Sequence, residues 1–99
     1  MNILYQFYKK HDIIKIRIRR LPTIFVEGPY RFYFFSREET RRHVHVASSD
    51  GEVKIWLEPE ISVAKVINLS ESEVNTILDI VQKRKEDINA DWNKHFSCN

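Results

Sequence analysis

Apolar and polar residues alternate with a period of two through much of the chain, a pattern typical of a β-sheet with two different faces. Four segments are rich in β-branched and aromatic residues and predict strands: 23–26, 30–35, 43–47 and 52–58. Turn residues separate them at Glu27–Pro29 and Ser48–Gly51. Residues 61–67 predict either a short fifth strand or an irregular crossover. This order predicts an antiparallel β-meander of four to five strands.

The C-terminal part of the chain follows a helical period instead. Ser70 with Glu73 three residues later forms a capping box, and Leu69 can pack on Val74 as a hydrophobic staple. Apolar residues then share one stripe at helical spacing: Val74, Ile77, Leu78, Val81, Ile88 and Trp92. We therefore expect one long helix from Ser70 to about Asn93–Phe96, packed on one face of the sheet in an α+β fold.

Alternation also divides the strand side chains between the two faces of the sheet. One face is aliphatic and is expected to lie under the helix: Val44, Val46, Val53, Ile55 and Leu57. The opposite face carries a different set: His43, His45, Lys54 and Trp56. A single helix in a chain of this length cannot cover both faces, so we expect the histidine face to stay uncovered.

His43 and His45 are the candidate catalytic residues. Residues i and i+2 of a strand point to the same side, roughly 6.5–7 Å apart. Two imidazoles at that spacing could share a metal ion or act as an acid/base pair. A metal would need further ligands, and no spacing commits His11 or His95, so we assign neither a metal nor a cofactor. The alternative is a structural role in hydrogen bonds to loop carboxylates.

Rings and positive charges accompany the two histidines. The candidate binding residues are Arg31, Tyr33, Arg41, Arg42, Lys54 and Trp56. Such a surface suits RNA, because bases stack on rings and arginines pair with phosphates. A metal-independent endoribonuclease would need the same parts: a base, an acid and a cation beside the phosphate. The alternative is a solvated basic loop and an aromatic residue packed by the N-terminal segment.

Charge is distributed unevenly along the 99 residues, whose formal net charge is +2. Residues 1–42 carry +6 (ten Lys/Arg against four acids) and residues 43–99 carry −4 (six against ten). This asymmetry fits a cationic surface that attracts phosphate, or two halves that complement each other within the fold. One cysteine, Cys98, excludes an intramolecular disulfide. The N-terminus has no apolar secretion signal, so we expect a cytoplasmic protein.

Several short motifs follow one another in an order that resembles a known family. They are Leu21-Pro22-Thr23-Ile24, Arg31-Phe32-Tyr33-Phe34, His43-Val44-His45-Val46, Lys54-Ile55-Trp56-Leu57-Glu58-Pro59 and Trp92-Asn93. This order resembles a small prokaryotic family known as domain of unknown function 4160, which has the pattern P-T-I, R-F-x-F, H-V-H-V, K-x-W-L-x-P and W-N. The resemblance covers Leu21 to about Phe96. It carries over His43, His45, Lys54 and Trp56 as motif positions.

The resemblance implies partners and no established activity. Genes of this family often lie beside another small gene, which implies a toxin–antitoxin-like pair, a small partner protein and RNA as a further ligand. Members usually have prolines before the first histidine, where this chain has Arg41-Arg42, so the loop here is more cationic.

The resemblance also divides the chain. Members usually begin near Leu21, so residues 21–99 form the domain and residues 1–20 are an extension of charge +5. Alternation of isoleucine with basic residues between Asp12 and Arg19 predicts an extra strand in it. The alternative is a start codon placed too far upstream.

These patterns predict a component of a toxin–antitoxin-like two-gene module. It would bind RNA, or cleave it without a metal, with one of His43 and His45 as base and the other as acid. Two alternatives remain open: a non-catalytic protein-interaction module resembling an antitoxin, and a small metal-binding protein.

Overall fold

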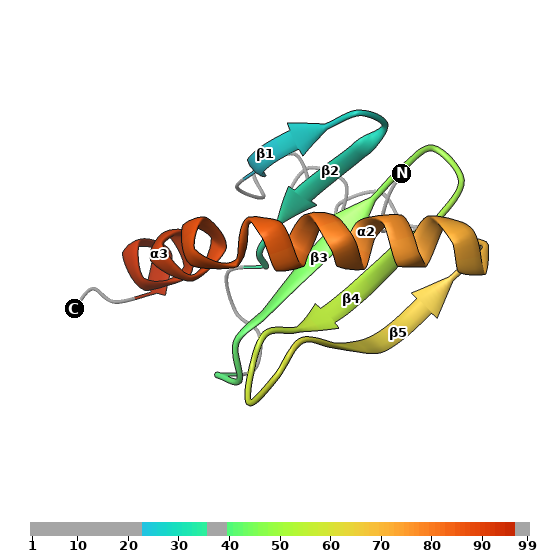
Figure 1. Ribbon diagram of the computed structural model, residues 1–99. Coiled ribbons are helices and arrows are strands. Elements are labelled where there is room, and N and C mark those ends of the chain that lie inside the picture. The colour runs from blue at the N-terminus through green and yellow to red at the C-terminus, as the bar shows by residue number, and fades with distance from the viewer. Residues whose placement is uncertain (1–22, 36–39, 97–99) are drawn as a thin grey trace, which may run out of the picture.

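The computed structural model describes residues 23–35 and 40–96, and there the chain forms one antiparallel sheet with two helices (Figure 1). The strands lie in sequence order: β1 (Thr23–Glu27), β2 (Tyr30–Tyr33), β3 (His43–Ala47), β4 (Glu52–Trp56) and β5 (Ser62–Ile67). The helices are α2 (Glu71–Lys83) and α3 (Lys85–Phe96). The predicted α+β meander is confirmed, with the fifth strand present. The strand expected at residues 12–19 lies outside the described residues.

Glycine is required at both predicted hairpin turns, for different reasons. Gly28 has a φ of +59°, a conformation that other residues rarely adopt. Gly51 follows the turn between β3 and β4, which the hydrogen bond from Ser48 N to Gly51 O closes at 2.9 Å. A Cβ on Gly51 would lie 2.1 Å from the carbonyl oxygen of Ile67, so a side chain there would push away the end of β5.

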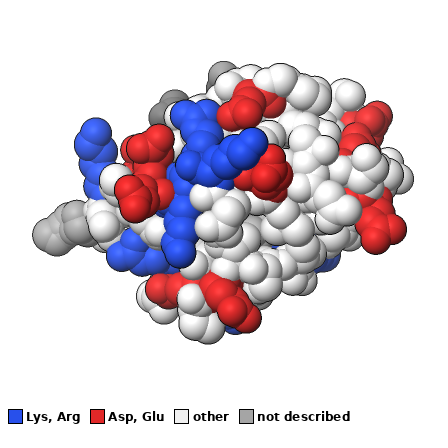
Figure 2. Space-filling model, in the orientation of Figure 1, with Lys and Arg blue, Asp and Glu red and all other residues white. Residues whose placement is uncertain are grey.

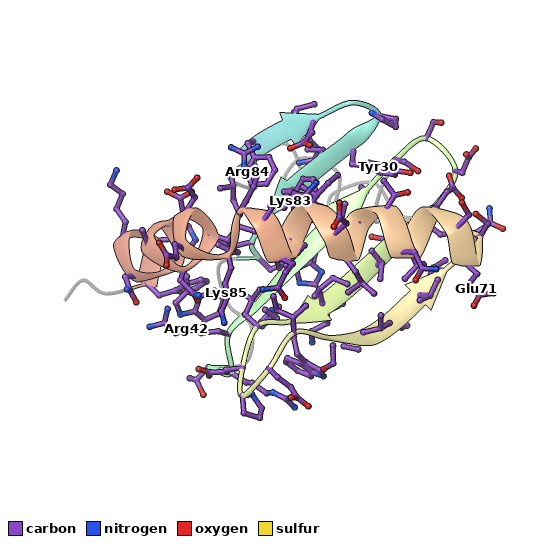
Figure 3. All side chains as sticks on the ribbon, viewed as in Figure 1. Tyr30, Arg42, Glu71, Lys83, Arg84 and Lys85 are labelled. Carbon is purple, nitrogen blue, oxygen red and sulfur yellow. The ribbon has the colours of Figure 1, made fainter. Side chains whose placement is uncertain are left out.

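The helix begins as predicted but does not continue as one element. Ser70 and Glu73 form the expected capping box. Arg84 then leaves helical geometry at φ −107° and ψ 20° and separates α2 from α3. Its side chain points toward β1, where the guanidinium carbon lies 3.6 Å from the ring centre of Phe25 and Nη1 bonds to Glu27 at 3.2 Å (Figure 3). The predicted helical segment is therefore present, but two helices divided at Arg84 stand in place of the single long helix that was expected. Neither described helix is long and apolar enough to cross a membrane.

Helix α2 lies across one face of the sheet and α3 continues beyond the ends of the strands (Figure 1). The core lies between the sheet and the helices. The buried residues include the aliphatic set predicted from alternation: Val44, Val46, Val53, Ile55 and Leu57. Ile77, Val81, Ile88 and Trp92 meet them from the helices, and Phe34 packs edge-to-face on Trp92 at 5.3 Å. Figure 2 shows charged side chains spread over this side of the molecule around a broad uncharged area.

Arg42 joins the sheet to α3. Its backbone N–H donates to Glu58 Oε2 at 3.0 Å, and its guanidinium donates to Asn89 Oδ1 at 3.2 Å and Asn93 Oδ1 at 2.5 Å. Leu57 N donates to Arg42 O at 2.9 Å, so the same residue also fixes the end of β4. Figure 3 shows Arg42 beside α3. We call Arg42, Glu58, Asn89 and Asn93 the Arg42 clamp.

Replacing Arg42 with alanine removes the side-chain part of this clamp. Hydrogen bonds to charged groups contribute about 1.5–3 kcal/mol, so we expect Arg42→Ala to lower the free energy of unfolding by about that amount. Urea unfolding followed by tryptophan fluorescence measures the change. The control Lys83→Ala removes only an exposed pair with Asp79 at 3.1 Å, and a loss under about 0.5 kcal/mol is expected. An equal loss of unfolding free energy in the two variants would contradict a stabilising role of the Arg42 clamp.

Candidate nucleic-acid interface

The side of the sheet opposite α2 (Figure 1), which we call the second face, gathers most of the predicted site residues. Strand pairing places Tyr33 opposite His45, His45 opposite Lys54, and Lys54 opposite Lys65. Paired residues point to the same side of a sheet, so these four form one row across β2 to β5. A second pair, His43 and Trp56, lies beside the row. Arg31 and Glu52 complete the set by the same alternation.

His43 and His45 do project together, as predicted, with ring centres 5.1 Å apart. Both are buried, however, with exposed fractions of 1% and 8%. Rings surround them: Trp56 and Trp92 lie 5.6 Å and 5.3 Å from His43, and Phe35 lies 4.5 Å from His45. The expectation that this part of the sheet stays uncovered is wrong, because both imidazoles are buried and lie among aromatic rings.

His43 also holds the main chain that precedes β3. Its Nδ1 lies 2.6 Å from the carbonyl oxygen of Arg41. A carbonyl can only accept a hydrogen bond, so Nδ1 carries a hydrogen and donates it. A buried imidazole that is bonded to the main chain and packed against tryptophans fits a structural role better than proton transfer to a substrate.

Arg41 and Trp56 form the exposed part of the site. The guanidinium carbon of Arg41 lies 3.9 Å from the ring centre of Trp56, and Arg41 Nε donates to the carbonyl oxygen of Glu58 at 2.9 Å. Lys54 Nζ lies 4.5 Å from the same ring. Arg41 is exposed, while Trp56 and Lys54 are partly buried. Cation–π contacts of this kind contribute about 0.5–1 kcal/mol at exposed sites and hold the side chains in place.

Glu52 lies toward the other end of the second face, close to Arg31 and Lys65. Burial raises the pKa of the Glu52 carboxyl above its ordinary value, and the hydrogen bond from Tyr33 Oη at 3.3 Å opposes that rise. The charges of Lys65 and Arg31 also oppose it. Arg31 is held over the Tyr33 ring at 4.4 Å and donates to Thr23 Oγ1 at 3.1 Å. Positive groups therefore stand at both ends of the second face.

Comparison with known proteins supports the resemblance given by the motif order. Residues 30–93 match the family described as "Domain of unknown function (DUF4160)". The chain belongs to this family. No curated protein and no solved structure matches the chain. The matched range runs from the start of β2 to Asn93 in α3, so the DUF4160 match includes both the second face and the Arg42 clamp.

The structure places one predicted site residue apart from the others and adds two charged residues to the second face. Arg42 was expected beside the phosphate contacts, but its guanidinium is engaged with Asn89 and Asn93 of α3. Lys65 was missed because a register shift between Lys54 and Ile55 decides which β5 residues reach the second face. Glu52 was not among the candidate binding residues named from the sequence. Within residues 23–35 and 40–96, no three His, Cys, Asp or Glu side chains form a group that could hold a metal ion.

The raised pKa of Glu52 makes the stability of the fold depend on pH. The folded chain keeps a proton on Glu52 where the unfolded chain has already lost it, so this contribution is complete below the ordinary pKa of 4.5. It is lost as pH rises through the folded pKa. We expect Glu52→Gln, which can still accept from Tyr33, to unfold in urea with a flatter dependence on pH above 4.5.

Tyr33→Phe serves as the opposite test. It removes the hydrogen bond that favours the charged carboxylate, so the pKa of Glu52 should rise further. The free energy of unfolding of this variant should then fall more steeply toward neutral pH than that of the wild type. If the free energy of unfolding depended on pH in the same way in the wild type and in Glu52→Gln, the pKa of Glu52 would not be raised by burial.

Proposed function

We propose that this DUF4160 domain is a non-catalytic RNA-binding module that acts in a toxin–antitoxin-like pair of proteins. One observation carries the proposal: an exposed arginine, Arg41, lies over the ring of Trp56 on a sheet face that also carries Arg31, Lys54 and Lys65. Arginine and aromatic rings are the groups that proteins use to contact unpaired bases and phosphates. The burial of His43 and His45 favours binding over cleavage, because an acid/base pair has to reach the reacting atoms.

The charge of the second face supports the same proposal. Four cationic side chains lie on or beside it: Arg31, Arg41, Lys54 and Lys65. Against them stands the carboxyl of Glu52, which accepts a hydrogen bond from Tyr33 Oη at 3.3 Å. A polyanion that contacts such a face displaces its own counterions, so the affinity falls with added salt. The helix side, in contrast, mixes acidic and basic side chains (Figure 2).

Salt dependence tests where RNA binds. Each phosphate contact contributes about 0.7 to the slope of log K against log salt for a single strand. We expect Arg31→Ala/Lys65→Ala to lower that slope by about 1.4, measured by filter binding of a mixed-sequence single-stranded RNA. The control Lys83→Ala/Lys85→Ala removes two exposed cations from the helices and should leave the slope unchanged. Equal effects of the two double variants, or no binding at low salt, would overturn the proposal.

A second candidate function is the docking of a small partner protein along β5. Val63, Val66 and Ile67 are 40%, 41% and 44% exposed, and β5 is the outermost strand on its side among the described strands. An open edge with exposed apolar side chains can accept an extended segment of a partner as a sixth strand. The occupant proposed is such a segment of the protein encoded by the neighbouring gene.

Co-purification with the neighbouring gene product tests this docking. We expect Val63→Glu/Val66→Glu to abolish the complex, because both side chains lie on the edge that would receive the partner. The control Val26→Glu introduces the same charge at a side chain that is 62% exposed in β1, and the complex should persist. A complex that survives the β5 changes would rule out this edge.

A further inference from the structure

The two neighbouring arginines before β3 have different surroundings and therefore different roles. The guanidinium of Arg42 lies against α3, bonded to Asn89 and Asn93. The side chain of Arg41 is exposed and lies over Trp56 on the second face. The guanidinium of Arg41 is therefore the one of the two that a ligand on the second face could contact.

Arg41 is held in place from three directions. The Trp56 ring lies under its guanidinium at 3.9 Å, and the carbonyl oxygen of Glu58 accepts from its Nε at 2.9 Å. The buried imidazole of His43 donates from Nδ1 to the main-chain oxygen of Arg41 at 2.6 Å. A long side chain normally has many rotamers, and these contacts remove much of that freedom before any ligand arrives.

The contacts use one side of the guanidinium and one of its three nitrogens. The Trp56 ring packs against the inner side of the guanidinium, and the carbonyl oxygen of Glu58 accepts from Nε. Nη1 and Nη2 have no hydrogen bond to the described residues. A planar guanidinium can carry a nucleobase on its outer side while its Nη groups donate to a phosphate oxygen. Lysine offers the same charge but no plane, so it cannot replace arginine in this role.

We infer that Arg41 is a stacking platform for an unpaired base, and that the ligand of the second face is single-stranded RNA. This inference rests on the proposed RNA-binding function and specifies its substrate class. Bases in a duplex are already stacked on one another and cannot lie on Arg41. Trp56 supports the platform from below, and His43 is a positioning residue that acts through the main chain of Arg41.

The fluorescence of 2-aminopurine tests the stacking. This base analogue is placed within a single-stranded RNA, and its emission is quenched when it stacks. We expect quenching by the wild-type protein. Arg41→Lys should weaken binding about fivefold or more, with little quenching and an unchanged salt slope, because the charge remains. Arg84→Lys, the same change at the α2–α3 break, should leave both quenching and affinity unchanged.

The outcomes separate this inference from the proposed function. If Arg41→Lys bound RNA and quenched the fluorescence as well as the wild type, Arg41 would not be a stacking platform. The proposed RNA-binding function would be unaffected by that result. Equal affinity for single-stranded RNA and for a duplex of the same length would overturn the single-stranded ligand. Binding of neither RNA by the wild-type protein would overturn the proposed function itself.

Two variants of His43 test its positioning role. His43→Asn keeps a side-chain N–H donor near the Arg41 carbonyl oxygen, whereas His43→Phe keeps a ring among the tryptophans but has no donor. We expect stronger quenching with His43→Asn than with His43→Phe, both compared at temperatures where circular dichroism shows a folded chain. Stronger quenching with His43→Phe would mean that the ring packing alone matters and would overturn the positioning role.

Discussion

The alternation of side chains along five short strands is the constraint on which the whole structure depends. It gives the sheet an aliphatic face and a second face of rings and charges. Helix α2 covers the aliphatic face (Figure 1), because burying that face contributes most of the favourable free energy available to a chain of this size. The two histidines, Lys54 and Trp56 are thereby placed on the other side.

The second face is itself divided. Its middle, around Tyr33, His43 and His45, is closed by aromatic contacts and is 8% exposed or less. Its border along β4 and β5 keeps Trp56 and Lys54 partly exposed and Lys65 exposed. The histidines thus belong to the support of the surface, and the exposed cationic side chains of Arg41 and Lys65 lie at its border. Arg41 connects the two parts, because His43 holds its main chain while Trp56 lies under its side chain.

Much of the fold could be predicted from the sequence because its signals are local. The Ser70–Glu73 capping box and the apolar period of two each depend on residues close together in the chain. The break at Arg84 has no such signal, since neither glycine nor proline marks it and its contacts are with Phe25 and Glu27 of β1. Local patterns could not predict this long-range pair.

The candidate site was only partly predictable for the same reason. Alternation placed His43 and His45 together, but it could not show that Trp92 of α3 packs on His43 with ring centres 5.3 Å apart. The different roles of Arg41 and Arg42 depend on Asn89, Asn93 and Trp56, which lie far along the chain. The family pattern marks positions but does not say which of their side chains are exposed. Exposure is what distinguishes a residue that supports the surface from one that could contact a ligand.

Chemical modification of the histidines tests the central claim most directly. Diethyl pyrocarbonate modifies accessible imidazoles, and mass spectrometry of the digested protein gives a rate for each one. His95 is exposed and serves as an internal reference in the same molecule. The account predicts that His43 and His45 react far more slowly than His95 in the folded chain and equally fast after unfolding. Reaction of His43 and His45 at the rate of His95 in the folded chain would contradict a second face that is closed at its centre.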